Sequence, residues 1–467
     1  MRRLQPDDLL LVLGPRPSVD VGAWLRDGLR EAIRSGRLDH GVVLPSARTT
    51  ASGLSLARGT VSSAVDELVG EGVLVSRPRS SVVVADVARP AGGEDAAGPV
   101  VVRPASVGTP DPALFPRAAW ARAVREAMRD LPDADLGYPD PQGLLALREA
   151  LAAHLRTTRA APVSADDVVV VSGVAQGLAL VGGVLAGAGA GAGARRVVVE
   201  DPASAGALEQ LRGAGLDVVP VPVDDAGIRT SELPTADAAL VTPAHQYPLG
   251  VVLAPDRRRD LVAWARDGDR LLLEDDYDAE LRYDRQPVGA LRGLDPQRVA
   301  LMGSVSKLLS PALRLGWVVA PPGLRAALVD AKRRADLGCS VPEQAAFARL
   351  IATGAYARHL RRTRLAYKRR RQVLLDALGR AAPRLTVEGV AAGLHLVVRM
   401  PDAAAEAHAV AGLRGRGVPA DALSAASARP AAWGVVMGVA RVHGAVVAEV
   451  VDVLRAAADG GLVPMVR

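Results

Sequence analysis

The sequence predicts an α/β protein. Its large domain has a mostly parallel sheet with helices on both faces, and a small domain of helices and a β-hairpin precedes it. From about residue 106 onward, short apolar runs alternate with segments of helical spacing, which is typical of a covered parallel sheet. The first 85 residues instead show amphipathic helical segments followed by two strand-like runs. We therefore expect these parts: a small domain at 1–85, a large domain at 106–467, and within it subdomains at about 140–330 and about 331–467.

Residues 86–105 separate the two domains. They include the run Ala-Arg-Pro-Ala-Gly-Gly-Glu-Asp-Ala-Ala-Gly-Pro, which has no hydrophobic periodicity and many residues that break helices and strands. Such a composition predicts a flexible linker. The linker is long enough for the small domain to sit apart from the large domain or to cross onto a partner subunit.

Composition narrows the class of protein. The chain has 467 residues, 49% of them hydrophobic and 23% charged, which is ordinary for a globular protein of two or three domains. Its single cysteine, Cys339, excludes an internal disulfide and a multi-cysteine metal centre, and we predict no metal site. No apolar run is long enough to span a membrane, and Asp7 and Asp8 interrupt any export signal. We expect a cytoplasmic protein without a membrane partner.

Three helices are expected in the small domain. Val21, Leu25, Leu29 and Ile33 fall at helical spacing, and the pattern stops at Gly36, a glycine just past the helix end. Residues 49–54 and 58–69 predict two further short helices. The apolar stripe of the last helix consists of Val61, Ala64, Val65 and Leu68.

This stripe leaves the polar start of the last helix exposed, with Arg58, Thr60 and Ser62 on it. A short helix start led by arginine is what the major groove of DNA admits. Residues 72–77 and 81–84 then form two strand-like runs around a basic turn, which predicts a β-hairpin wing. A net charge of only +2 over residues 1–85, from 11 arginines and 9 acidic residues, does not by itself indicate DNA binding.

The sequence of this domain, including the glycine and proline positions in its turns, resembles the winged helix-turn-helix of GntR-type bacterial repressors. The similar residues are Leu29-Arg30-Glu31-Ala32-Ile33, Gly36, Leu38, Gly41, Leu44-Pro45-Ser46, Arg48, Leu56-Ala57-Arg58-Gly59-Thr60-Val61 and Leu68-Val69 with Glu71-Gly72 and Leu74. The resemblance implies binding to double-stranded operator DNA through Arg48, Arg58, Thr60, Ser62 and Arg77. The wing tip reads Arg79-Ser80-Ser81, where the family usually has Gly-Ser-Gly. The alternative is a helical domain used for dimerisation.

Polar residues follow the strand-like runs of the large domain, where ligands of parallel sheets bind. Residues 168–171 lead into Ser172-Gly173-Val174-Ala175, at a helix start whose free N–H groups suit a phosphate. Residues 239–241 lead into a segment with His245 and Tyr247, and residues 271–273 into Glu274-Asp275-Asp276-Tyr277-Asp278. Each segment has an ordinary structural explanation alone, such as a solvated acidic loop or a packed histidine. Their joint order predicts one crevice.

Lys307 stands out because the chain has only three lysines among 57 basic residues. Arginine cannot lose its proton, whereas lysine can, and a free amine attacks a carbonyl carbon. Lys332 and Lys368 stand in arginine-rich runs and are expected to be surface residues. Lys307 follows a buried strand-like run and the hydroxyls of Ser304 and Ser306, which suit an anion.

The run Ser304-x-Ser306-Lys307, with Arg314 seven residues later, resembles the cofactor lysine region of fold-type I aminotransferases, which use pyridoxal 5'-phosphate (PLP). This likeness implies a Schiff base between PLP and Lys307. PLP chemistry needs a protonated ring nitrogen, for which Asp275 is the expected partner, and Tyr277 is placed to donate to the phenolate oxygen. The expected phosphate-binding residues are Gly173, Val174, Ala175, Ser304, Ser306 and Arg314, and His245 and Tyr247 complete the expected cofactor site.

The whole arrangement resembles the MocR/GabR family, in which a GntR-type domain is fused to an aminotransferase-like domain. Motifs that carry this likeness are Pro110-Asp111-Pro112, Gly137-Tyr138, His245-Gln246-Tyr247-Pro248, Glu274-Asp275-Asp276-Tyr277-Asp278 and Arg358-His359-Leu360-Arg361. It implies a transcriptional regulator that responds to PLP or to an amine or amino-acid effector. It also implies a head-to-tail homodimer, with the DNA-binding domain of one subunit on the large domain of the other and Tyr138 at the partner's cofactor phosphate.

Two departures bear on whether the domain is an enzyme. Ser204 stands where the family usually stacks a tyrosine on the cofactor ring, and Met437 is expected where aminotransferases clamp the substrate carboxylate with an arginine. Arg441 and Arg399 are the candidate substitutes. These changes favour a regulator without physiological turnover that retains at most a half-transamination. The alternatives are a working aminotransferase with an accessory DNA-binding domain, and a DNA-binding protein that never binds PLP. No motif identifies the effector or the operator, and none shows whether the protein activates or represses transcription.

Overall fold

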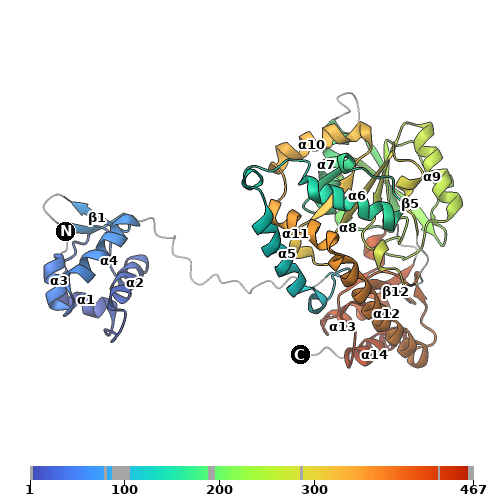
Figure 1. Cartoon of the computed structure of the whole chain (residues 1–467). Helices are drawn as coiled ribbons and strands as arrows, with labels where there is room; N and C mark the ends of the chain where they lie inside the picture. Colours follow the sequence, from blue (N-terminus) through green and yellow to red (C-terminus); the bar gives the residue numbers. More distant parts are fainter. Residues whose placement is uncertain are drawn as a thin grey trace. The chain divides into compact units, whose positions relative to one another are not determined.

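The computed structural model describes residues 4–77, 81–86, 106–187, 195–283, 288–429 and 432–460. The chain divides into two compact units, Met1–Val102 and Arg103–Arg467, and both are drawn in Figure 1. The expected linker, apart from its first residue, and the wing tip at 78–80 lie outside the described residues. Among those residues, no helix combines the length and the hydrophobicity that a membrane span requires.

The N-terminal unit consists of helices followed by a hairpin. Its elements are α1 (Pro6–Leu13), α2 (Val21–Arg34), α3 (Ala47–Gly53), α4 (Arg58–Gly70), β1 (Leu74–Arg77) and β2 (Ser81–Val84). The strands pair antiparallel, with Leu74 opposite Val84 and Arg77 opposite Ser81, so the wing predicted from the sequence is present. Helix α1 was not predicted, and its Leu9 is fully buried against the core of this unit.

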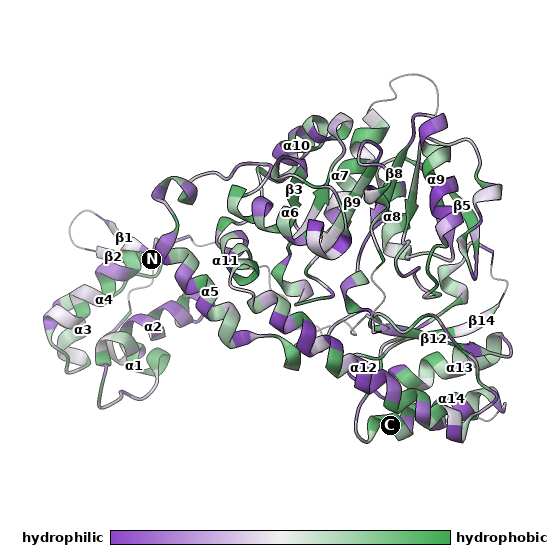
Figure 2. Cartoon of the chain, turned by 45° about the vertical axis from the view of Figure 1, so that its right-hand side comes forward, coloured by the Kyte–Doolittle hydropathy of each residue, from purple (hydrophilic) through white to green (hydrophobic). Residues whose placement is uncertain are grey.

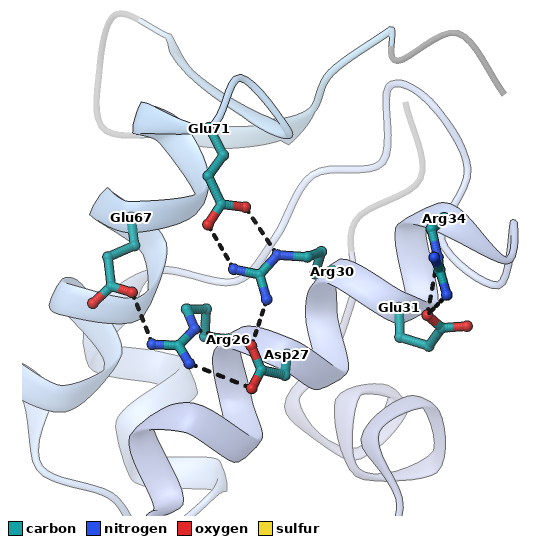
Figure 3. Close-up of polar contacts among 7 residues, drawn as sticks. All are labelled: Arg26, Asp27, Arg30, Glu31, Arg34, Glu67 and Glu71. Atoms are coloured by element: carbon teal, nitrogen blue, oxygen red, sulfur yellow. Dashed lines mark hydrogen bonds and ion pairs between the residues drawn. The ribbon is translucent and has the colours of Figure 1, made fainter. Parts of the chain in front are cut away.

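Ion pairs tie α2 to α4 across the surface of this unit (Figure 3). Arg30 donates two hydrogen bonds to the Glu71 carboxylate, at 2.9 and 2.5 Å, and Arg26 donates to Glu67 at 3.0 Å. Asp27 lies between the two arginines and accepts from both. A single exposed ion pair contributes little to the stability of a protein. A network with bidentate contacts, as here, instead fixes how the two helices are oriented toward each other. The arginines of α2 are thus occupied within the unit.

The C-terminal unit contains a sheet with the strand order β3-β10-β9-β8-β7-β4-β5-β6. Strands β4, β5, β7, β8 and β9 pair in parallel where they adjoin, and β10 runs antiparallel between β3 and β9. The fold class predicted from the sequence is therefore confirmed. The strands are β3 (Val168–Val171), β4 (Arg196–Asp201), β5 (Asp217–Asp224), β6 (Gly227–Ile228), β7 (Ala238–Val241), β8 (Leu271–Asp275), β9 (Val299–Ser304) and β10 (Gly316–Val319).

Alternate residues of these strands pack against helices on opposite faces, as the two-residue period of a strand requires. Val169 and Val171 pack in one cluster with α7 (Val174–Gly187), α8 (Ala205–Gly213) and α10 (Pro322–Asp336). Val168 and Val170 pack in another with helices of the opposite face. Those helices are α5 (Arg117–Asp130), α6 (Leu145–Arg159) and α11 (Val341–Ala352), and α9 (Pro255–Asp267) covers the same face further along the sheet. In Figure 2 the strands at the sheet centre are coloured as hydrophobic, while α9 carries hydrophilic stretches.

The last part of the chain has its own core, built on a four-stranded antiparallel sheet of order β11-β12-β14-β13. Val398, Val435 and Leu454 are completely buried in that core. The long helix α12 leads into it, and its Leu374 and Leu378 are the first residues of the chain to join the core. The elements are α12 (Ala355–Ala381), β11 (Val387–Glu388), β12 (His395–Met400), α13 (Ala403–Arg414), β13 (Ala420–Ala422), β14 (Trp433–Gly438) and α14 (Val446–Ala458).

Candidate cofactor site and DNA-binding face

A cavity of about 240 Å³ lies at the carboxyl ends of the parallel strands, and we call it the strand-end cavity. Of the predicted cofactor residues, Tyr247, Asp275, Tyr277 and Lys307 line it together, and so does Ser204. They follow different strands but meet because parallel strands end at the same edge of a sheet. The complete lining is Ser106, Val107, Gly108, Val199, Glu200, Ala203, Ser204, Ala207, Leu240, Thr242, Tyr247, Asp275, Tyr277, Asp278, Lys307, Leu394, His395 and Asp421.

Asp275, the last residue of β8, offers the cavity an unsatisfied acceptor. Its Oδ1 atom is buried and has no hydrogen-bond partner among the described residues. Burial, and to a lesser degree the Asp276 charge, raise the pKa of this carboxyl to about 7 against the opposing effect of the Lys307 charge. A buried carboxylate without a partner is costly, and a protonated ring nitrogen would supply the missing donor and charge. The residue therefore fits the PLP ring as the sequence predicts.

Lys307 enters the cavity just after β9 ends at Ser304. Burial lowers the pKa of its ammonium group, and the nearby Asp278 and Asp275 carboxylates partly restore it. A lysine with a lowered pKa releases the neutral amine more readily, and only the neutral amine attacks a carbonyl carbon. The position and the protonation of Lys307 thus both suit covalent attachment of a carbonyl cofactor.

Lys332 does not lie at the surface as the sequence predicts. Its side chain is fully buried on α10, and its ammonium group donates to both carboxylate oxygens of Asp336, at 2.6 and 2.7 Å. The arginine-rich run misled the prediction because successive residues of a helix point in different directions, so one of them faces the core.

Tyr277 and His245 form a hydrogen-bonded group with Asp278. The Tyr277 hydroxyl lies 3.0 Å from Nδ1 of His245, and the same nitrogen lies 2.9 Å from Asp278 Oδ2. His245 is buried but does not line the strand-end cavity, so the structure places it behind Tyr277 rather than beside the ring. With His395, His245 and Asp278 bring three possible metal-ligand atoms within 4.8 Å of one another, and the hydrogen bond between His245 and Asp278 accounts for their proximity.

The predicted phosphate-binding residues gather at a neighbouring position, outside the strand-end cavity. Gly173 has a φ of +124°, and a Cβ atom there would lie 3.4 Å from the Arg314 guanidinium. A Cβ atom on Gly316 would lie 2.9 Å from Gly173 and 3.2 Å from the side chain of Ser304, so these residues are packed closely. The Ser306 N–H donates to Ser304 Oγ at 3.3 Å. Helix α7 begins at Val174 and Ala175, and the first N–H groups of a helix have no partner within it, which suits an anion.

Several residues of the strand-end cavity had no role in the predicted cofactor site. Glu200, at the end of β4, accepts hydrogen bonds from the backbone N–H and the hydroxyl of Thr242, and burial raises its pKa to about 7. The sequence places Glu200 at a strand end of the same crevice, after residues 197–199, but assigns it no role. His395 and Asp421 come from strands of the C-terminal core, and nothing in their local sequence indicates a site. Burial lowers the pKa of His395 to about 4, which keeps its ring neutral.

The structure corrects the expected position of Met437. Its side chain is fully buried in the C-terminal core and does not line the strand-end cavity. The neighbouring Val436 packs on the other face of β14 with Val107 and Leu249, because side chains alternate along a strand. Arg399, a candidate substitute for the carboxylate clamp, pairs with Glu388 at 2.7 Å, and neither it nor Arg441 lines the cavity.

Tyr138 is 89% exposed and does not line the strand-end cavity of its own chain. It lines a surface hollow of about 900 Å³ between α5, α6 and α11. An exposed tyrosine of this kind is compatible with a role toward another subunit, as the sequence predicts, and not with one toward its own cofactor.

The predicted DNA-binding residues lie on exposed parts of the N-terminal unit. Arg48 on α3 and Arg58 at the start of α4 are exposed, and neither has an ion pair or hydrogen bond within the described part of the chain. Thr60 and Ser62 are half-buried on α4, and Arg77 is exposed at the end of β1. Whereas the arginines of α2 are paired with carboxylates, Arg48 and Arg58 remain available to phosphates.

Two protein families match the two units. Residues 24–84 match the family described as bacterial regulatory proteins of the gntR family, and residues 108–433 match aminotransferase class I and II. Both families match where the sequence placed them. Aminotransferases of this class use PLP as their cofactor. The buried Asp275 Oδ1 atom, which has no hydrogen-bond partner among the described residues, fits the ring nitrogen of PLP.

Curated relatives share this combination of domains over most of the chain. The pyridoxine biosynthesis transcriptional regulator PdxR of Corynebacterium glutamicum is 36% identical over 84% of this chain and 86% of its own. The probable rhizopine catabolism regulatory protein MocR of Rhizobium meliloti is 31% identical over 96% of both chains.

A solved structure supports the assignment of the large unit. Pyrococcus horikoshii kynurenine aminotransferase, whose crystal structure contains PMP, has a TM-score of 0.68 and 27% identity, covering 76% of this chain and 90% of its own. Together with the cavity at Lys307 and the exposed arginines of the N-terminal unit, these matches show that the chain belongs to the MocR-type transcriptional regulators, in which a GntR-type helix-turn-helix domain is fused to an aminotransferase-like PLP-binding domain.

Proposed function

We propose that this regulator controls its binding to an operator through the occupancy of the strand-end cavity. One observation carries the proposal. Residues 106–108 form part of the cavity wall beside Lys307, and they directly follow the stretch of chain that comes from the DNA-binding domain. A ligand in the cavity therefore contacts residues 106–108, which follow the linker directly. Such a ligand shifts the DNA-binding state only if it binds one arrangement of this segment better than another.

Each residue group of the site has its own role toward PLP. Lys307 would hold PLP covalently, Asp275 would pair with its ring nitrogen, and Tyr277, held by His245, would donate to its phenolate oxygen. PLP supplies a carbonyl carbon that amines attack and a ring that withdraws electrons. The phosphate is bound by Ser304, Ser306, Arg314 and the N–H groups of Gly173, Val174 and Ala175. Tyr247 forms the wall next to Tyr277, in an edge-on ring contact at 6.2 Å.

The 106–108 segment is held firmly at two points. Val107 is 4% exposed and packs in one cluster with Leu249, Val397, Leu423 and Val436, on the face of β12 and β14 opposite the C-terminal core. Gly108 lies so close to Lys307 that a Cβ atom there would stand 2.6 Å from Nζ. Any group attached to Nζ must therefore share space with this segment, and this contact gives cofactor and effector a route to the linker.

Val107→Ala is expected to separate ligand binding from the DNA response. The smaller side chain loosens the packing of the 106–108 segment without removing any group that holds PLP. We expect PLP uptake close to that of the wild type, but a loss of most of the PLP-dependent change in operator affinity. Fluorescence anisotropy of a selected operator fragment, with and without PLP, measures this. Val450→Ala, a buried valine of α14, controls for general loosening, and a Val107→Ala protein that responds like the wild type contradicts the proposal.

We also propose that the protein is a homodimer with a head-to-tail arrangement, in which the C-terminal unit pairs through the surface around Tyr138. Exposed large apolar residues gather there, and contiguous exposed apolar surface marks interaction sites. They are Met128, Leu136, Tyr138 and Leu145. Sedimentation of the full chain is expected to show a dimer, and Tyr138→Asp to shift it toward the monomer. A monomeric wild-type protein at micromolar concentration rules the arrangement out.

A working aminotransferase is the less favoured function for this site. No arginine lines the strand-end cavity among the described residues, so one chain offers no bidentate partner for a substrate carboxylate.

A further inference from the structure

The strand-end cavity has an unusual balance of charge for a site that receives amino acids. Its described lining contains the carboxylates of Glu200, Asp275, Asp278 and Asp421 but only one cation, Lys307. Under the proposed function, Lys307 and Asp275 are engaged by PLP. Asp278 is engaged by His245. The carboxylates left for a second ligand are therefore Glu200, whose pKa burial raises to about 7, and Asp421.

Asp421 is the carboxylate best placed to meet such a ligand. It lies on β13, and among the described residues only its Oδ1 atom is engaged, by Arg414 at 2.7 Å. Arg414 is held in place by the backbone carbonyl of Ala420, also at 2.7 Å, so the arginine is anchored beside Asp421. Arg414 does not line the cavity, whereas Asp421 does. The charge of Asp421 also acts on a residue that lines the cavity. Burial, the larger cause, and the Asp421 charge together raise the pKa of Tyr247 to about 12.

The described lining offers a ligand carboxylate no cation besides Lys307; the donors left to it are hydroxyls, such as those of Ser106, Ser204 and Tyr247. Val107, the one member of the apolar cluster beside β14 that lines the cavity, offers none. A ligand carboxylate near Asp421 would thus meet a like charge with no cation to offset it, which disfavours it. A ligand ammonium at the same place would instead gain a charge-assisted hydrogen bond.

We propose that the effector is a short aliphatic diamine, with one amine at the Lys307 end of the strand-end cavity and its second, charged amine at Asp421. This inference rests on the proposed function and adds the chemical class of the ligand. The cavity of about 240 Å³ must accept the effector beside the ring, which limits its length. Asp421 acts as a specificity residue that selects a second positive charge and rejects a carboxylate.

Three probes of equal chain length test the charge requirement on the full chain loaded with PLP: 1,4-diaminobutane, 1-aminobutane and 4-aminobutanoate. Calorimetric titration is expected to show the diamine binding about tenfold more tightly than the monoamine, the size of one favourable charged contact, and 4-aminobutanoate binding most weakly. Asp421→Asn is expected to remove the difference between diamine and monoamine. Asp452→Asn, an exposed carboxylate of α14 paired with Arg455, is the matched control.

Distinct outcomes separate this inference from the proposed function. Equal binding of diamine and monoamine, tightest binding of 4-aminobutanoate, or an unchanged preference in Asp421→Asn overturns the diamine assignment while the regulator remains. A wild-type protein that takes up no PLP, seen as no visible absorbance of the bound cofactor, overturns the proposed function itself. If Asp421→Asn does not fold, shown by circular dichroism, Asp421→Glu keeps the charge, and the wild-type ranking of the three probes alone decides.

Discussion

Lys307→Ala is expected to abolish the covalent retention of PLP without unfolding the protein. Lys307 is the only lysine that lines the strand-end cavity. Lys332 is buried in an ion pair with Asp336, and Lys368 donates to the backbone carbonyl of Tyr283, so neither amine can replace it. The substitution also removes a buried group whose pKa burial has lowered, so little stability should be lost.

The measurement is borohydride reduction of the PLP-loaded protein, followed by mass spectrometry of the peptide that contains residue 307. The wild type should carry the reduced cofactor on this peptide, and Lys307→Ala should carry none. Lys368→Ala is the matched control and should label like the wild type. Asp275→Asn should keep the lysine but retain PLP more weakly, because its amide cannot balance a protonated ring nitrogen. Labelling of another lysine in Lys307→Ala would refute the assignment of this site.

Arg58→Ala is expected to weaken operator binding by roughly 10- to 100-fold, which corresponds to the loss of one specific arginine contact. Arg58 leads α4, is exposed, and has no ion pair or hydrogen bond within the described residues, so its charge is available to DNA. The fold should not change, because the side chain makes no polar contact that holds the unit together. If Arg58 contacts a phosphate, the dependence of affinity on salt should also fall by about one counterion.

Anisotropy titrations of a labelled operator at several salt concentrations measure both effects. Arg34→Ala is the matched control: Arg34 is also exposed, but it lies on α2 and pairs with Glu31 at 2.7 Å. Its removal should change operator affinity by much less. An equal loss in the two variants would mean that only net charge matters, and an unchanged affinity in Arg58→Ala would place the DNA-binding surface elsewhere.

Much of the large domain could be predicted because its strands are buried on both faces. A strand such as β3, Val168–Val171, then forms a continuous apolar run, and the polar residue that follows it marks the ligand edge of the sheet. Asp275 and Lys307 were predicted in this way, and both line the strand-end cavity. Strand β10 was not predicted as the antiparallel insertion between β3 and β9, since strand order leaves no local signal.

The remaining parts of the site depend on contacts between distant residues. Val107, His395 and Asp421 meet Lys307 only after the C-terminal core has packed onto the sheet. No sequence pattern near any of them indicates a cavity. Met437 shows a different limit: a shift of one residue along β14 moves a side chain from one face to the other, and only the pairing of the strands fixes which residue faces the site.

Because Gly108 lies so close to Lys307, the size of the side chain at position 108 limits the space around the lysine's amine. A methyl group at this position would compete with Nζ for the same volume, from 2.6 Å away. Because Nζ is the far end of a flexible side chain and can move aside, Gly108→Ala should displace the lysine's amine and weaken its loading while keeping the lysine. Such a protein would let the loading of Lys307 be changed on promoters in living cells without altering a single ionisable group.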